Sequence, residues 1–254
     1  MAVNLAAHAP LLDVRSLSLS TRLCAASFDL AHGEMLGLIG PNGAGKSTLL
    51  QCLAGIAPGA GDVLLGGQPL AALPRRERAQ HIGWLPQAQT SAWALRVQDV
   101  VALGRLPWGD RDAATGQQAV AQAIAQTGIE GLAARPVDAL SSGEQARVWL
   151  ARVLAGQPRL LLADEPIASL DLKHQRAALD TLRRYADADR GVILAIHDLG
   201  LAARWCDRLC LLQAGRVRSI GAPREVLTET LLAEVFNAPV HADLDADPPV
   251  VVLK

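Results

Sequence analysis

Gly40-Pro41-Asn42-Gly43-Ala44-Gly45-Lys46-Ser47-Thr48 decides the fold of this 254-residue chain. Two glycines separated by four residues and followed by Lys and Ser match the phosphate-binding loop pattern. Glycines let a backbone curl tightly and offer its N–H groups to phosphate oxygens. The stretch follows an apolar strand, Met35–Ile39, and opens a helical pattern whose N-terminus adds positive potential. A chance glycine-rich turn is the alternative, but this strand–turn–helix context argues against it.

The chain contains only three lysines, Lys46, Lys173 and Lys254, and otherwise uses arginine as its strong base. A compact ammonium suits a crowded phosphate cradle better than a planar guanidinium does. We therefore expect Lys46 to reach the β- and γ-phosphates of a nucleotide. The hydroxyl of Ser47 is expected to bind magnesium.

A second motif, Leu160-Leu-Leu-Ala-Asp164-Glu165-Pro166, places two carboxylates at the end of an apolar run. Asp164 is expected to hold magnesium, usually through water. Glu165 is expected to orient or deprotonate the attacking water. Adjacent strand residues point to opposite faces, so the two carboxylates can have different roles. An acidic turn after a strand is the alternative for this motif taken alone.

A third motif, Leu140-Ser141-Ser142-Gly143-Glu144-Gln145, indicates the start of a helix capped by Ser141 or Ser142. A serine-rich helix start is also an anion site. It lies far in sequence from the phosphate loop, so it can serve the nucleotide of a second molecule as well as its own.

In this order the three motifs resemble Walker A, the signature and Walker B of the ABC ATPases. The resemblance covers nearly the whole chain from about residue 11 and extends to Gln87, Asp171 in Ser169-Leu170-Asp171, and His197. It implies catalytic roles for Glu165, His197 and Gln87, and magnesium binding by Ser47, Gln87 and Asp164. The implied ATP-binding residues are Gly40, Pro41, Asn42, Gly43, Ala44, Gly45, Lys46, Ser47, Thr48, Ser141, Ser142, Gly143, Glu144 and Asp171.

The chain departs from the family pattern at two places. Ser142 stands where the signature usually has glycine, and its Cβ restricts the approach of backbone to phosphate. The segment Ser20-Thr-Arg22-Leu-Cys24 lacks the aromatic ring with which the family stacks adenine. Arg22 is a candidate substitute, because a guanidinium can stack on a flat ring.

Composition limits the function classes. Half of the residues are hydrophobic, which supports a real core, and the net charge of −1 argues against a nucleic-acid-binding surface. No apolar run is long enough to span a membrane, and Met1–Pro10 lacks the features of a signal peptide. The four cysteines match no zinc pattern and indicate reduced thiols.

The predicted fold class is α/β: a phosphate-loop NTPase (RecA-like) core with a mainly parallel sheet, an N-terminal antiparallel β subdomain and an inserted helical subdomain. Apolar strands alternating with helical patterns predict the parallel sheet. Residues 1–88 and 158–254 are assigned to the nucleotide-binding core with its β subdomain. Residues 89–157, rich in Ala and Gln with helical apolar spacing, are assigned to the helical signature subdomain.

The resemblance implies an ATPase that works as a pair of identical chains enclosing two ATP molecules with magnesium. A separate membrane permease would contact Gln87 and the segment from Ala88 to Trp108, on the cytoplasmic face of the inner membrane. A periplasmic or surface binding protein would deliver the substrate. Val100–Pro107 and Asn237–Lys254 are similar to ATPases that import iron–siderophore, haem or cobalamin chelates, and Ser20–Cys24 is similar to the cobalamin importer's ATPase. Two alternatives remain: a soluble ABC protein without a permease, and a small phosphate-loop kinase, which would lack residues 140–144 and His197.

Overall fold

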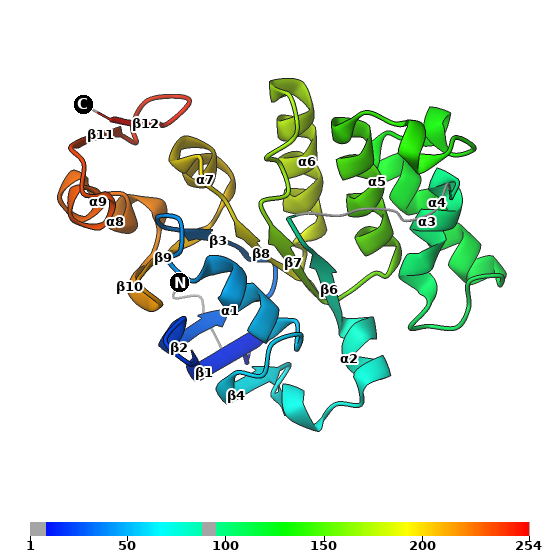
Figure 1. Cartoon of the computed structure of the whole chain (residues 1–254), viewed down its shortest axis with the longest axis horizontal. Helices are drawn as coiled ribbons and strands as arrows, with labels where there is room; N and C mark the ends of the chain where they lie inside the picture. Colours follow the sequence, from blue (N-terminus) through cyan, green and yellow to red (C-terminus); the bar gives the residue numbers. More distant parts are fainter. Residues whose placement is uncertain (1–8, 88–94, 254) are drawn as a thin grey trace, which may run out of the picture.

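A computed structural model describes residues 9–87 and 95–253 of the chain. Its centre is a six-stranded sheet in the order β10-β9-β3-β8-β7-β6 (Figure 1). All neighbours in it are parallel except the edge pair β9–β10, an antiparallel hairpin that turns at Ala214-Gly215. The strands are β3 (Met35–Ile39), β6 (Ile82–Leu85), β7 (Leu160–Asp164), β8 (Gly191–Ala195), β9 (Arg208–Gln213) and β10 (Arg216–Gly221).

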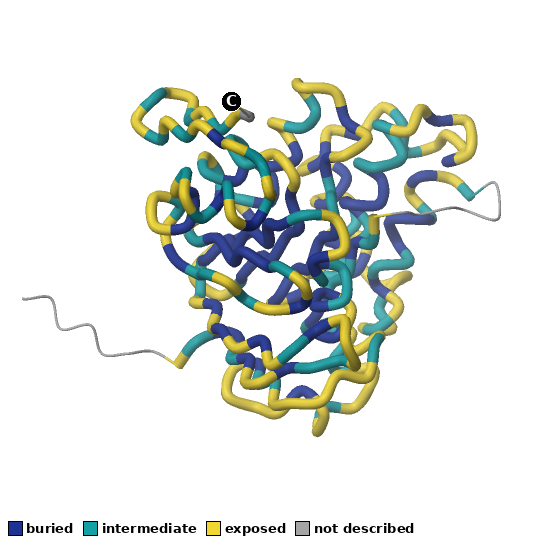
Figure 2. The backbone as a smooth tube through the Cα atoms, turned by 60° about the vertical axis from the view of Figure 1, so that its left-hand side comes forward, coloured by how far each residue is buried: buried dark blue, intermediate teal, exposed yellow. Residues whose placement is uncertain are grey.

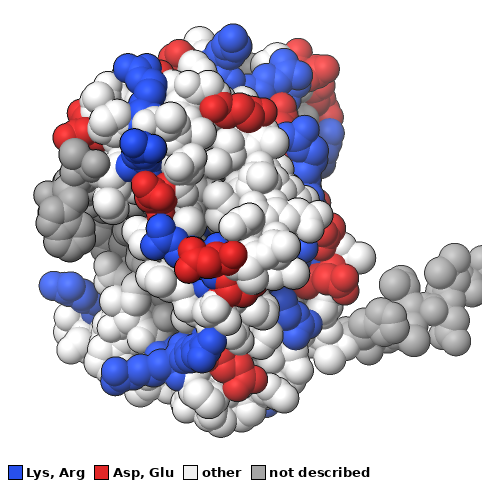
Figure 3. Space-filling view, turned by 90° about the vertical axis from the view of Figure 1, so that its right-hand side faces the viewer, with Lys and Arg blue, Asp and Glu red and all other residues white. Residues whose placement is uncertain are grey.

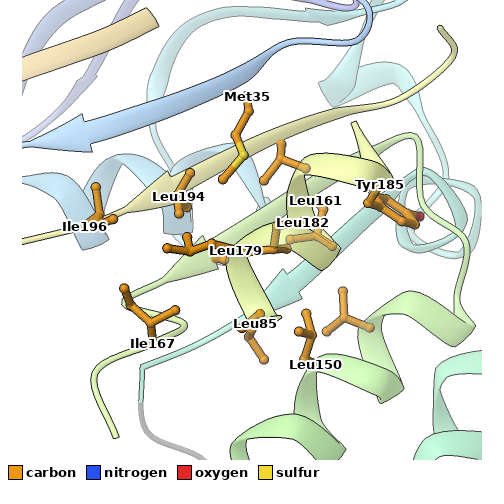
Figure 4. Close-up of a cluster of buried hydrophobic side chains, with 14 of the residues drawn as sticks. Met35, Leu85, Leu150, Leu161, Ile167, Leu179, Leu182, Tyr185, Leu194 and Ile196 are labelled. Carbon is orange, nitrogen blue, oxygen red and sulfur yellow. The ribbon is translucent and has the colours of Figure 1, made fainter. Parts of the chain in front are cut away.

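Both faces of the central strands are buried, as their uninterrupted apolar runs predict (Figure 2). Alternate residues of each strand enter different hydrophobic clusters. On one face, Met35, Leu161 and Leu194 from three neighbouring strands point toward Leu179 and Leu182 (Figure 4). Helices α6 (Leu172–Tyr185) and α7 (Leu199–Trp205) pack on this face.

The other face packs on α1 (Lys46–Leu53), which also contacts an antiparallel sheet in the order β2-β1-β4-β5. The hairpin β1–β2 turns at Ser20–Arg22, next to the phosphate loop. This sheet contains β1 (Leu12–Leu19), β2 (Leu23–Leu30), β4 (Ala60–Leu65) and β5 (Gln68–Pro69), and it is followed by η1 (Leu70–Ala72) and α2 (Arg75–His81).

Helices dominate residues 97–155, as the Ala- and Gln-rich composition predicts, and they lie beside the sheet at its β6 edge (Figure 1). Acidic and basic side chains are interspersed on the face that they expose (Figure 3). These elements are α3 (Val97–Ala102), η2 (Leu103–Arg105), α4 (Ala114–Thr127), η3 (Glu130–Leu132), η4 (Val137–Ala139) and α5 (Ser142–Ala155). The proposed subdomain boundaries at residues 88 and 157 stay predictions.

Helices α8 (Pro223–Val226) and α9 (Glu229–Phe236) precede a C-terminal hairpin of β11 (Val240–Asp243) and β12 (Val250–Leu253). None of the helices in the described ranges is long and apolar enough to cross a membrane. Within those ranges all four cysteines are free, and burial raises the pKa of Cys206 and of Cys210 to about 12.

Candidate functional site

The predicted chemical residues meet at one edge of the central sheet, because the carboxyl ends of parallel strands lie together. The phosphate loop follows β3, Asp164 ends β7, and His197 lies two residues after β8. Gln87 lies two residues after β6, the edge strand beside β7. A cavity of about 710 Å³ at this edge is lined by Arg22, Asn42, Gly43, Ala44, Gly45, Lys46, Ser47, Thr48, Gln87, Glu165 and His197.

The phosphate loop needs glycine at two positions for steric reasons. Gly40 has φ +141°, and a Cβ there would lie 2.2 Å from the carbonyl oxygen of Leu212. Gly45 has φ +105°, and a Cβ there would lie 2.8 Å from the carbonyl oxygen of Arg22. Gly45 also precedes α1, whose first turn has no side-chain cap and no acidic residue. The amides at this helix start are therefore left for an anion.

Lys46 is buried at the centre of the loop. Its Nζ donates to the carbonyl oxygens of Gly40, at 2.7 Å, and Pro41, at 3.1 Å. Burial lowers the pKa of Lys46, while the nearby carboxylates of Glu165 and Asp164 oppose that effect. A bound phosphate group would replace the two neutral carbonyl acceptors with a negatively charged acceptor, to which the Lys46 ammonium makes a stronger hydrogen bond.

Asp164 and Ser47 have the donor chemistry of a magnesium site. Asp164 is 5 % exposed, and its Oδ1 is a buried oxygen without a hydrogen-bond partner among the described residues. Burial raises the pKa of this carboxyl, and the Ser47 hydroxyl opposes the rise. No group of three or more His, Cys, Asp and Glu in the described ranges could hold a metal by itself. A phosphate-loop magnesium does not require one, because it uses a hydroxyl, a carboxylate, water and phosphate oxygens. These residues therefore fit Mg²⁺.

Glu165 is held by two of the residues that the resemblance singled out. Gln87 Nε2 donates to its Oε2 at 2.7 Å, and His197 Nε2 is hydrogen-bonded to its Oε1. Strand alternation does not separate the two carboxylates, because β7 ends at Asp164. Glu165 instead adopts a left-handed φ of +51°, and its side chain lines the cavity.

The signature segment lies outside the phosphate-loop cavity. Ser141, rather than Ser142, is the N-cap of α5, and it forms a capping box with Glu144. The Ser141 N–H donates to the Glu144 carboxylate at 2.9 Å, and the Glu144 N–H donates to Ser141 Oγ at 3.3 Å. None of the residues from Ser141 to Glu144 lines the phosphate-loop cavity of this chain.

Ser142 lines a neighbouring cavity of about 250 Å³, together with Gln87 and Glu165. Trp149, also in its lining, is a residue that the sequence argument missed. The spacing along α5 could have found it. Ser142, Gln145 and Trp149 lie three and four residues apart and therefore share one face of the helix. Gln145 Nε2 donates to the carbonyl oxygens of Val137 and Leu140, both at 3.1 Å, and so holds the loop before α5.

In the single chain, the Asp171 side chain caps the N-terminus of α6. Its carboxylate accepts from the His174 backbone N–H at 2.9 Å and lies 2.8 Å from His174 Nδ1. It does not line the phosphate-loop cavity.

Arg105 belongs to the segment expected to contact a permease, but its side chain is buried. It is 4 % exposed, pairs with Asp110, and donates to the carbonyl oxygen of Ala155 at 3.1 Å. It therefore supports the fold, whereas Leu106 is 61 % exposed and free to contact another protein. Residues 88–94 of the expected permease-facing segment lie outside the described residues.

Residues 23–168 match the family model described as ABC transporter. The hemin import ATP-binding protein HmuV of Streptomyces coelicolor is 48 % identical over 84 % of this chain and 77 % of that protein. The cobalamin import ATP-binding protein BtuD of Halobacterium salinarum is 45 % identical over 85 % of this chain and 55 % of that protein. A solved structure described as an inward-facing metal-chelate type ABC transporter aligns with TM-score 0.81 and 26 % identity, over 96 % of this chain and 97 % of the matched chain.

Proposed function

Since the chain belongs to the ABC transporter family of ATPases, we propose that it is the ATP-hydrolysing subunit of an importer for haem- or cobalamin-type metal chelates. It would work as a pair of identical chains on the cytoplasmic face of a membrane, bound to a separate permease. A periplasmic or surface binding protein would deliver the chelate to that permease.

The observation that supports hydrolysis most strongly is the convergence of Lys46, Ser47, Asp164, Glu165 and His197 at one sheet edge. The glycine loop and Lys46 would bind the phosphates, while Asp164 and Ser47 would hold magnesium, which neutralises phosphate charge when bound. Glu165 would take a proton from the attacking water. Gln87 and His197 would hold the Glu165 carboxylate in position through the hydrogen bonds that they already make.

A pair of chains would explain why the signature segment has the features of an anion site yet does not line the phosphate-loop cavity of its own chain. The start of α5 would offer backbone N–H groups to the phosphates bound by the other copy. Two copies related by a two-fold axis could place each signature segment over the other copy's phosphates. ATP would then act as the ligand that shifts the equilibrium toward the closed pair.

The proposal for the cargo is supported by the relatives, whose names give hemin and cobalamin import. The sharp test is uptake in the source organism after deletion of this gene. We expect loss of either haem or cobalamin uptake, restored by the wild-type gene and not by Lys46→Ala. Normal uptake of both chelates in the deletion strain, with intact ATPase activity of the purified protein, would favour an ABC ATPase without this permease role.

A further inference from the structure

A further cavity of about 470 Å³ lies where α4, α5 and α6 meet, and it shares no lining residue with the phosphate-loop cavity. We call it the basic cavity. Its polar lining comes from Gln126, Thr127, Arg147, Lys173, His174, Asp180, Thr181 and Arg184. Three of these side chains are cations near neutral pH, and one is a carboxylate.

The hollow follows from the sequence of α6. Lys173, Ala177, Thr181 and Arg184 recur at intervals of three or four residues, so they share one face of the helix. The small side chain of Ala177 leaves space between the two long cationic side chains. Arg147 contributes a third cation from α5, across the cavity.

Among the described residues, Arg147 and Arg184 have only neutral hydrogen-bond partners, and Lys173 forms no hydrogen bond or ion pair. Asp171 and Glu144, outside the lining, interact with Lys173 and Arg147 only at longer range. Arg147 Nη1 donates to the carbonyl oxygen of Gly128 at 2.9 Å, and Arg147 Nε is a buried N–H without a partner in that part of the chain. Arg184 Nη2 donates to the Thr181 hydroxyl at 3.3 Å. A buried donor without a partner is costly, so an acceptor that reached it would bind favourably.

The acidic side chain in the lining is engaged elsewhere. Asp180 accepts from Trp205 Nε1 at 3.0 Å, and it lies 3.7 Å from Arg176 Nε. His174, through its Nδ1, is already bonded to Asp171. The basic cavity therefore has a surplus of positive charge that no carboxylate in its own lining neutralises.

We propose that the basic cavity binds a small multivalent oxyanion of the phosphate class. Guanidinium groups match the geometry of such an anion, and charge-assisted hydrogen bonds are the strong ones. An anion bound there would link Arg147 on α5 to Lys173 and Arg184 on α6. It would thereby restrain α5, which begins with the signature segment, against α6, which begins at Asp171.

Calorimetric titration of pyrophosphate at constant ionic strength tests the proposal. The titration uses the Lys46→Ala variant, because pyrophosphate would also occupy an intact phosphate loop. We expect saturable binding of one anion per chain. Adding Lys173→Ala and Arg184→Ala should weaken that binding by about tenfold or more, because two charge-assisted contacts are lost.

The matched control adds Arg75→Ala and Arg216→Ala, which remove two exposed cations outside the basic cavity. Its affinity should change by no more than about twofold, as expected of surface substitutions. Lys173→Gln with Arg184→Gln is the second test variant if the alanine variant folds poorly. Absence of saturable binding, or an equal loss in the control, would overturn the proposal. The titration needs no hydrolysis, so its outcome is independent of the proposed transport function.

Discussion

Glu165 follows the last residue of β7, but its backbone is left-handed and not extended. Its φ of +51° is uncommon for a residue with a side chain, and both carboxylate oxygens are hydrogen-bonded. Backbone strain of this kind costs about 1–3 kcal/mol and persists where surrounding structure enforces it. Here the side chains of Gln87 and His197 hold the Glu165 carboxylate. The Glu165 N–H donates to the carbonyl oxygen of Ala195, which holds the backbone.

Glu165→Gln should retain ATP binding and lower steady-state hydrolysis by about 10²–10⁴-fold, because a general base contributes that much. The isosteric amide can keep one hydrogen bond to Gln87 or His197, so the cavity should keep its shape. Hydrolysis rates and the amount of bound ATP, measured on the same preparation, check the result. Near-normal turnover would show that another group activates the water.

Arg22 is the residue that sets the prediction for base specificity. It lines the phosphate-loop cavity at the turn of the β1–β2 hairpin, where the family stacks an aromatic ring. A guanidinium stacks on adenine and guanine alike, so ATP and GTP should be hydrolysed with similar kcat/KM. Arg22→Ala should weaken both nucleotides by about 1–3 kcal/mol, which is the range for a stacked base. A strong ATP preference that survives Arg22→Ala would refute this assignment.

The sequence predicted the chemical residues better than their contacts. The motif spacing located the phosphate loop, Asp164, Glu165 and His197, because parallel strands carry each of them to the same edge. It did not predict the left-handed backbone at Glu165, since that depends on hydrogen bonds between segments far apart in the chain. It also did not predict the burial of Arg105, which depends in part on the carbonyl oxygen of Ala155, fifty residues away in the chain.

At the scale of elements, the strand predicted over Met35–Ile39 is β3, and the helix predicted to start with a cap at Ser141 or Ser142 is α5. The C-terminal hairpin β11–β12 was not predicted as strands, because residues 240–253 combine a short apolar run with an acidic loop. The element η2 and the turn after it contain two neighbouring residues of opposite character. Arg105 points into the protein, while Leu106 is exposed.

Arg105→Met should destabilise the fold by about 3 kcal/mol, because it leaves Asp110 and the Ala155 carbonyl without their partner. The Arg105 hydrogen bond lowers the pKa of Asp110, so this pair stabilises the fold above the unfolded pKa of about 4 and is lost as pH falls below it. Denaturant unfolding at pH 7 and pH 3 should therefore show a smaller difference between variant and wild type at pH 3. The control is Arg75→Met on exposed α2, and an equal effect in both variants would contradict the structural role.

Leu106→Ser should impair transport while leaving basal hydrolysis within about twofold, because the side chain is exposed and does not line the phosphate-loop cavity. The exposed apolar side chain is instead available to the proposed permease. Uptake by cells and ATPase activity of the purified chain measure the two effects. Ile56→Ser, at a similarly exposed apolar residue, is the control. An equal loss of hydrolysis and transport would place Leu106 in the fold rather than at an interface.

At the scale of the whole molecule, one chain contains all the parts of the site but does not assemble them. The phosphate loop and Glu165 line one cavity, while the capped start of α5 lies outside it. The central claim is that a second copy completes the site. We therefore expect a chain with a defective phosphate loop and a chain with a defective signature segment to form one working site together.

Mixing Lys46→Ala subunits with Ser141→Arg subunits tests this claim most directly. Each parent pair has two defective sites, whereas a mixed pair has one site with both parts intact. Because Ser141 also caps α5, Ser141→Ala is the control for the loss of the cap, which alone costs about 1 kcal/mol. We predict that an equimolar mixture pairs in the presence of ATP and hydrolyses it faster than either parent, toward about a quarter of the wild-type rate if the sites act independently. A mixture that neither pairs with ATP nor exceeds its parents in hydrolysis would contradict the shared site.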